Sequence, residues 1–263
     1  MKEPDEAIEV HDIERLIHRR KERRLKDEER RKVVEEVFDY RTLLALHKLF
    51  SRGVLQRLYG VVAAGKEARV YWGVSPEGRD LAVKIFLVVT AEFRKSRLRY
   101  MVGDPRFRRI RRDPWSLIRM WCYKEYRNLS RAYRAGVSTP EPLTAYENIL
   151  VMEFVDAGER GVPAPLLKSV ELEDPTSMYL QVKEEIRNIV RAGLVHADLS
   201  EYNILVKDNR PVIIDWGSAV LLSHPHAEEF LLHDIRTVFA YFRRLGVSTD
   251  DPIEFFRSLM AGE

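Results

Sequence analysis

The 263-residue sequence predicts an α+β fold in which a small antiparallel sheet with helices is followed by a mainly helical part. Strand-like runs separated by short turns begin near Leu58. Beyond residue 175 the apolar residues recur at helical spacing instead. The composition, 45% hydrophobic and 32% charged, fits one two-lobed domain with a sizeable core and a short extension.

Residues 1–50 are predicted to form a charged helical extension. The stretch 19–32 mixes acidic and basic residues too finely for a basic tail, and opposite charges stand three or four residues apart, as on an exposed helix. Ile13, Leu16 and Ile17 add one narrow apolar stripe, which predicts a docked or frayed helix. Apolar residues between 33 and 46 predict a second helix with a buried face.

The predicted sheet and its helix occupy residues 51–152. Turns at Ala64-Gly65 and at residues 76–78 separate the first strands, and Gly136 ends the helix as its C-cap. The predicted strands are 58–63, 68–74, 80–87, 143–146 and 149–154, the helix is 115–135, and a basic insert fills 91–114. The predicted C-terminal lobe, 153–263, contains helices at 175–193, at about 225–244 and from Pro252 onward.

One run of short polar residues between apolar stretches predicts a catalytic and metal site. The sequence HADLSEYNILV starts at His196 and is followed by IIDWG, so Asp198 stands five residues before Asn203, with Asp215 shortly after. Carboxylate and carboxamide oxygens are the donors that Mg²⁺ prefers, which makes Asn203 and Asp215 candidate metal ligands. Asp198 can orient or deprotonate an attacking hydroxyl. Together these residues resemble half of a phosphoryl-transfer site.

The nucleotide half is predicted upstream. Lys84 stands at the centre of the apolar strand LAVKIF, where a charge is costly unless it meets phosphates or a carboxylate. A small-residue turn before it would let backbone N–H groups approach phosphate oxygens. Glu125, on the predicted helix, is the natural partner for Lys84. The candidate nucleotide-binding residues of the turn and the following strand are Ala63, Ala64, Gly65, Lys66, Glu67 and Val70.

Each motif taken alone has an ordinary alternative. A Gly-Lys-Glu turn is usually a surface hairpin, a single lysine in a strand is more often on an edge, and a single glutamate in a helix is usually solvated. An HxDxxxxN run followed by DxG, each between strand-like runs, is much rarer. Strand lysine, helix glutamate, HxD, Asn and DxG also follow one another here in the chain order of protein kinases.

These residues resemble the Rio family of atypical serine/threonine protein kinases, and within it the Rio-one subgroup. The likeness spans about residues 60–234. It is carried by GKEARVY, LAVKIF, DPRFRR in the insert, KEYRNL, VMEF, HADLSEYNIL, IDWGSAV and HPHAEEFLLHD. It implies a two-lobed kinase-like fold without the usual activation segment and peptide-binding subdomains. Only 48 residues follow Asp215 and no APE motif occurs, which agrees.

The resemblance also implies roles for individual residues, with ATP and Mg²⁺, or Mn²⁺ in its place, as cofactors. Lys84 would contact phosphates and pair with Glu125. Asp198 would be the catalytic aspartate. Asp215 would bind metal with Asn203 and also accept phosphate, as an acyl phosphate formed during ATP hydrolysis. Backbone groups around Met152, Glu153 and Val155 would bind the adenine.

Two departures from the family pattern affect the expected site. Ala63 and Ala64 stand where family members often carry hydroxyl residues, which removes a side-chain contact to phosphate. Trp216 and Gly217 replace the more frequent Val/Met-Ser pair, so the loop beside the metal has no expected conformation.

The basic insert predicts a nucleic-acid partner. From Arg94 to Arg119 there are ten Arg or Lys residues against two acids, with aromatic residues interleaved. Such a composition suits phosphate backbones and stacked RNA bases. With the resemblance it predicts the small ribosomal subunit precursor and its rRNA as partners, with no DNA and an unknown protein substrate. The alternative is a solvated loop whose aromatic residues pack on the two lobes.

The remaining composition bears on location and source. The single cysteine, Cys122, excludes an internal disulfide and fits a reducing compartment. No apolar stretch approaches the length of a membrane span and no signal peptide is evident, so a cytoplasmic protein without a membrane partner is expected. Two glutamines and five asparagines beside abundant Arg and Glu suggest a thermophilic source, and the resemblance an archaeal one.

Other functions stay open at this point. A small-molecule kinase of the aminoglycoside-phosphotransferase type shares HxDxxxxN, and a nucleotide-gated binding module would need little chemistry. The cluster His224, His226, His233 and Asp234 could be a metal site, although Pro225 and the helical spacing favour capping and packing. His196 is expected to brace the catalytic loop.

Overall fold

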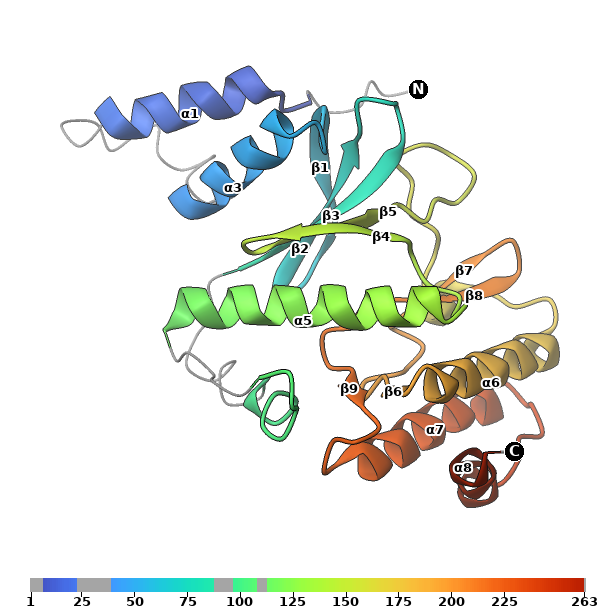
Figure 1. Cartoon of the computed structure of the whole chain (residues 1–263). Coiled ribbons are helices and arrows are strands. Elements are labelled where there is room, and N and C mark those ends of the chain that lie inside the picture. The colour runs from blue at the N-terminus through green and yellow to red at the C-terminus, as the bar shows by residue number, and fades with distance from the viewer. Residues whose placement is uncertain (1–6, 23–38, 88–96, 108–112, 263) are drawn as a thin grey trace. The chain divides into compact units, whose positions relative to one another are not determined.

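The computed structural model describes residues 7–22, 39–87, 97–107 and 113–262, and the chain forms two compact units. The first unit combines residues 1–88 with 143–154, and the second combines 89–142 with 155–263. These units follow from contacts in space, whereas the predicted domain boundaries follow motif order along the chain and stay a prediction. Figure 1 labels the elements of both units.

The first unit is built on a five-stranded antiparallel sheet with the strand order β1-β2-β3-β5-β4 (Figure 1). All five predicted strands are confirmed: β1 (Arg57–Ala64), β2 (Ala68–Val74), β3 (Asp80–Phe86), β4 (Pro142–Tyr146) and β5 (Ile149–Glu153). The pairing aligns Ala63, Val70, Lys84 and Leu150 in one row across β1, β2, β3 and β5. The sheet register therefore places the predicted nucleotide turn next to the strand lysine.

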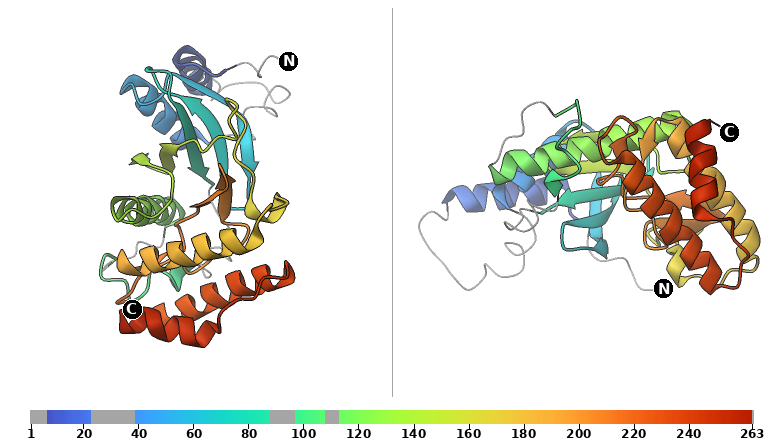
Figure 2. Two further views of the ribbon diagram at one scale, coloured as in Figure 1. Left: turned by 90° about the vertical axis from the view of Figure 1, so that its right-hand side faces the viewer. Right: turned by 90° about the horizontal axis from the view of Figure 1, so that it is seen from below.

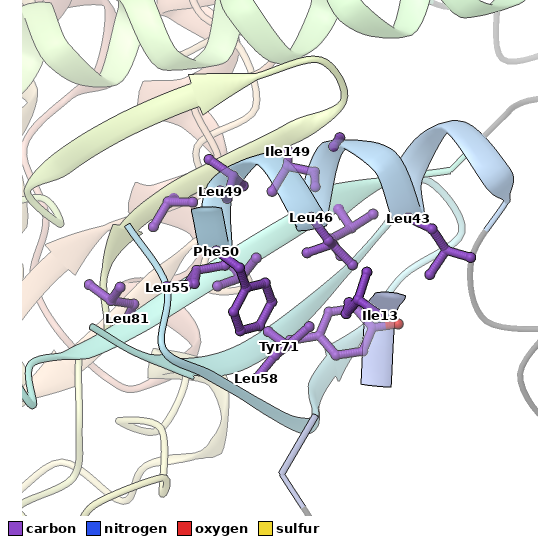
Figure 3. Close-up of a cluster of buried hydrophobic side chains, with 14 residues drawn as sticks. Ile13, Leu43, Leu46, Leu49, Phe50, Leu55, Leu58, Tyr71, Leu81 and Ile149 are labelled. Atoms are coloured by element: carbon purple, nitrogen blue, oxygen red, sulfur yellow. The ribbon is translucent and has the colours of Figure 1, made fainter. Parts of the chain in front are cut away.

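Two helices cover the apolar core of this sheet, α1 (Val10–Glu22) and α3 (Tyr40–Ser51). Leu46 and Leu49 of α3 and Ile13 of α1 are buried in one cluster with strand residues such as Leu81 and Ile149 (Figure 3). The second helix was predicted over 33–46, but α3 begins later because Asp39 caps it by accepting the N–H groups of residues 41 and 42. Residues 33–38 of that prediction lie outside the described residues.

The second unit is mainly helical. Its helices α6, α7 and α8 lie side by side (Figure 2), and two short strand pairs, β6-β9 and β7-β8, complete it. Its elements are α5 (Pro114–Arg134), the 3₁₀ turn η2 (Leu167–Ser169), α6 (Pro175–Arg191), β6 (Leu194–Val195), β7 (Ile204–Lys207), β8 (Arg210–Ile213), β9 (Val220–Leu221), α7 (Ala227–Arg244) and α8 (Pro252–Ala261). The predicted helices are thus confirmed.

Two further features agree with the predicted fold class. Asp113 caps α5, followed by Pro114 in its first turn, and Gly136 lies just beyond its C-terminal end with φ +83°. Residues 216–226 alone connect Asp215 to α7, so this connection holds only the two-residue strand β9 and no extended activation segment.

In the described part of the chain, no helix is long and apolar enough to cross a bilayer.

Candidate active site

The first unit holds the predicted nucleotide-binding strands and turn. The turn between β1 and β2 is closed by a 2.9 Å hydrogen bond from the Gly65 N–H to the Ala68 carbonyl, and Ala63 to Lys66 are exposed. Lys84 pairs with Val70 on one side and Leu150 on the other, with Nζ 5.2 Å from the Phe86 ring centre. Open backbone in the turn and a cation one strand away suit a polyphosphate.

Other predicted nucleotide-binding residues lie where the chain passes from the first unit into the second. Met152 and Glu153 pair with Ala82 and Leu81 across β3 and β5, and Val155 is the first residue of the second unit after this strand. Binding of adenine by this segment stays a prediction. The pairing of Lys84 with Glu125 also stays a prediction, because Lys84 belongs to the first unit and Glu125 to the second.

The second unit brings the catalytic and metal residues together. The β7-β8 hairpin pairs Ile204 with Ile213, so Asn203 and Asp215 both lie at the open end of one hairpin. The N–H of Ile214 donates to the Asn203 carbonyl at 3.0 Å, which locks the two loops. The Asn203 side chain donates from Nδ2 to the backbone oxygen of Asp198 at 2.7 Å. The three motif residues are thus neighbours in space.

His196 braces this arrangement, as predicted. It is buried, its Nε2 lies 3.0 Å from the Ile214 carbonyl oxygen, and its ring meets the edge of Trp216 at 5.0 Å between centres. Trp216 donates from its indole N–H to the Thr139 hydroxyl at 2.8 Å. The tryptophan that departs from the family pattern is therefore a fully satisfied core residue.

Gly217 is required by a close approach of helix α5. A Cβ atom at this position would lie 2.9 Å from Trp121 Nε1 and 3.1 Å from Glu125 Oε2. A larger residue would force Trp121 to shift and would crowd the buried Glu125, one of the predicted site residues. Glu125 thus lies against the loop that follows Asp215.

The electrostatic setting favours Asp198 as a base. Burial and the negative charge of Asp215 raise the pKa of Asp198 above the ordinary value for aspartate, while Arg97, Asn203 and His233 act in the opposite direction. A carboxylate with a raised pKa is the better proton acceptor at neutral pH. The effect of the Asp215 charge on the pKa of Asp198 agrees with two carboxylates that lie near each other.

Asp234, on α7, supports the loop that carries Asp198 through two hydrogen bonds. Its carboxyl oxygens accept the N–H groups of Ala197 at 2.7 Å and Leu199 at 2.9 Å, the two residues that flank Asp198. Ala197 has φ +64°, a left-handed conformation that needs such support. Burial raises the pKa of Asp234 to about 8. Sequence reasoning placed Asp234 only in a packing cluster, because no local motif marks its partners.

Arg97 is a second residue that the motifs did not reveal. Its guanidinium lies 4.3 Å from the Trp121 ring centre and donates to the Ser218 hydroxyl at 3.2 Å. Burial lowers the pKa of Arg97, and the negative charges of Asp215, Glu125 and Asp198 oppose that shift. Arg97 of the insert therefore places a positive charge near the acidic residues of the site. The composition of the insert alone does not show which of its basic residues does so.

The donor set fits a magnesium ion. Asp215 supplies a carboxylate and Asn203 an amide oxygen at one end of the hairpin, and phosphate oxygens would complete such a site. Across the ranges that the structure describes, no three His, Cys, Asp or Glu side chains gather in a way that could hold an ion. The Nδ1 atom of His224 instead accepts the His226 N–H at 3.2 Å, and its Nε2 lies 3.0 Å from the Val102 carbonyl oxygen.

Comparisons with known proteins agree with this geometry. Residues 69–254 match the family model described as the RIO domain. The RIO-type serine/threonine-protein kinase Rio1 of Haloferax volcanii is 44% identical over 253 residues, covering 93% of this chain and 86% of that protein. Rio1 of Methanocaldococcus jannaschii is 37% identical, over 90% and 84%. Human RIO1 is 39% identical over 89% of this chain, which spans only 41% of that longer protein.

A solved structure shares the fold. The Rio2 kinase–ADP/Mg²⁺–phosphoaspartate complex from Chaetomium thermophilum is 25% identical with a TM-score of 0.65, covering 83% of this chain and 65% of that one. The kinase-like fold class predicted from the motifs is thereby confirmed. The domain match, the archaeal relatives and the fold together show that this chain belongs to the RIO family of serine/threonine-protein kinases.

Proposed function

We propose that the chain transfers the terminal phosphoryl group of Mg–ATP, with Asp198, Asn203 and Asp215 as the reacting centre. The observation that carries this proposal is the convergence of these residues in the second unit, where Asn203 is bonded to both flanking loops. Bound Mg²⁺ would neutralise charge on the phosphates. Positioning and charge stabilisation supply most of the acceleration in such reactions.

The phosphate acceptor is proposed to be Asp215 itself during ATP hydrolysis. A carboxylate oxygen of Asp215 would attack the terminal phosphorus while the bond to the ADP oxygen breaks and ADP leaves. Water would then cleave the acyl phosphate, releasing phosphate and restoring the carboxylate, with Asp198 taking the proton of that water. The Rio2 structure that contains ADP, Mg²⁺ and a phosphoaspartate supports this proposal by analogy.

The chain is further proposed to act on the small ribosomal subunit precursor through its basic insert. The support is the composition of residues 94–119, together with the family membership. Five of the nine arginines of this region lie outside the described residues, namely Arg94, Arg108, Arg109, Arg111 and Arg112. Arg97 and Arg106 are described, and they donate to Ser218 and Asn128 within the second unit.

ATP turnover with and without purified small ribosomal subunits tests both proposals. Turnover that requires Mg²⁺ and rises with the subunits is expected. Stimulation by a small alcohol in place of the subunits would favour a small-molecule kinase. An absence of Mg²⁺-dependent turnover, with nucleotide still bound, would favour a binding module and contradict the proposed chemistry.

A further inference from the structure

The loop that follows Asp215 is held by two buried side chains of helix α5. Lys124 donates from Nζ to the carbonyl oxygens of Gly217 at 2.8 Å and Ala219 at 2.5 Å. Asn128 donates from Nδ2 to the carbonyl oxygens of Trp216 at 3.0 Å and Ala219 at 2.7 Å. We call Lys124 and Asn128 the carbonyl clamp. It engages three of the four residues after Asp215.

Burying the two polar side chains of the clamp costs folding free energy. Lys124 and Asn128 are both 0% exposed, and burial lowers the pKa of Lys124 well below the ordinary value for lysine. Apolar side chains of similar volume commonly stabilise a core at least as well as buried charged groups do. The sequence nevertheless places two hydrogen-bond donors here, aimed at the backbone of one short loop. Such directionality points to control of backbone geometry beyond simple packing.

The geometry under control is that of Asp215. This residue has φ +63°, in the left-handed region that side-chain-bearing residues rarely occupy. Such a conformation persists only where its surroundings over-determine it. On one side Ile214 is bonded to Asn203 and His196, and on the other the clamp fixes residues 216–219. The clamp therefore secures the side of Asp215 that its own hairpin does not.

The clamp is connected to the basic insert. Arg106 donates from Nη1 to Asn128 Oδ1 at 2.8 Å, which leaves the Asn128 Nδ2 group oriented toward the loop carbonyls. Arg106 is itself held by Asp104, whose side chain is fully buried, through hydrogen bonds of 2.6 to 3.1 Å. The Asp104–Arg106 ion pair of the DPRFR motif is thus hydrogen-bonded directly to the clamp.

This part of the insert packs against the second unit. Tyr100 and Met101 are buried, and the Val102 carbonyl oxygen lies 3.0 Å from His224 Nε2. A Cβ at Gly103, where φ is +88°, would lie 2.9 Å from the Pro225 ring. The described segment 97–107 is therefore a structural support of the site as well as part of a basic sequence.

We propose that Lys124 and Asn128 are positioning residues that hold Asp215 in the conformation able to bind a divalent cation, and that Arg106 of the insert sets the orientation of this clamp. This inference rests on the proposed function, because it concerns the metal site used there. None of the three side chains need touch the metal. Partners that fix a metal ligand typically change metal affinity by roughly 10- to 100-fold when they are lost.

The test uses the full chain and measures Mn²⁺ affinity by electron paramagnetic resonance in the presence of ADP. Asn128→Asp keeps an acceptor for Arg106 and removes the two donors to the loop. Asn209→Asp, at an exposed turn at the far end of the β7-β8 hairpin, is the matched control. ADP affinity without metal and the unfolding temperature are recorded for each variant.

The expected result is a loss of Mn²⁺ affinity of roughly tenfold or more in Asn128→Asp, with ADP affinity and secondary structure retained. Arg106→Gln is expected to weaken Mn²⁺ binding as well, and to add little when combined with Asn128→Asp, because both act through one contact. If Asn128→Asp does not fold, Lys124→Met removes the other donor without adding a charge, and the same loss is expected.

Two outcomes would overturn the inference. One is Mn²⁺ affinity in the clamp variants equal to that of Asn209→Asp. The other is a joint fall of metal affinity, ADP affinity and unfolding temperature, which would show general support of the fold. Failure of the proposed function is distinguishable, because the wild-type chain would then lack Mn²⁺ binding that Asp215→Ala abolishes.

Discussion

Asn203 donates its side-chain N–H to the backbone oxygen of Asp198 at 2.7 Å. The backbone carbonyl of Asn203 accepts the N–H of Ile214, the residue before Asp215. One asparagine therefore fixes the separation of the two loops that carry the aspartates. This explains why the motif needs a carboxamide: its N–H group bonds to one loop, and its oxygen stays available for a cation.

Replacing Asp198 by Asn is expected to lower ATP turnover by about 10²- to 10⁴-fold, because the proton acceptor is lost. ATP binding should change little, since the amide has the same size. Turnover is measured at saturating Mg–ATP and binding by calorimetry. Asp208→Asn, at an exposed turn, is the matched control. Undiminished turnover in Asp198→Asn would remove this residue from the mechanism.

Replacing Arg97 by Gln is expected to shift the acidic limb of the pH–rate profile to higher pH. The positive charge of Arg97 lowers the pKa of Asp198, which burial and Asp215 raise. Without that charge the pKa of Asp198 rises further, so a higher pH is needed to deprotonate the base. Arg134→Gln, exposed at the end of α5, should leave the profile in place. Coincident profiles for Arg97→Gln and wild type would contradict the assignment.

Asp234 is expected to make stability depend on pH. Its pKa is about 8 in the folded chain against an ordinary value of 3.8, so between these values the folded state binds one proton more than the unfolded state. Stability from this group is therefore full below about pH 4, falls as pH rises toward 8, and is constant above that. Asp234→Asn should lack this fall in denaturant titrations from pH 5 to 8. Parallel curves for the two proteins would show that Asp234 is ionised when folded.

Binding to small-subunit RNA is expected to weaken steeply with salt, because counterions are released when basic residues meet phosphates. Charge reversal at Arg108, Arg109, Arg111 and Arg112 should reduce affinity and flatten the salt dependence. Filter binding at several salt concentrations measures both. Binding that ignores salt would argue against the insert as an RNA contact.

The motif residues could be placed from sequence because their positions depend on local order. The runs Ile204–Val206 and Val212–Ile214 predict strands, and a short hairpin between them brings Asn203 and Asp215 together. The position of Lys84 at the centre of β3 likewise follows from the apolar run around it, which predicts a strand.

The supporting residues could not be placed in this way. Asp234, Lys124 and Asn128 are buried polar groups whose partners lie 35 to 95 positions away in the chain, so only tertiary packing identifies them. The expectation of one helix running through Asp39 is wrong for a different reason, because apolar periodicity alone does not show that Asp39 is extended and caps α3.

The central claim is tested most directly by a single-turnover reaction with ATP labelled at the terminal phosphate, followed by acid quenching and hydroxylamine. The wild-type chain is predicted to carry label that hydroxylamine releases, and Asp215→Asn to carry none. Equal hydroxylamine-labile label on Asp215→Asn would contradict the assignment of Asp215 as phosphate acceptor.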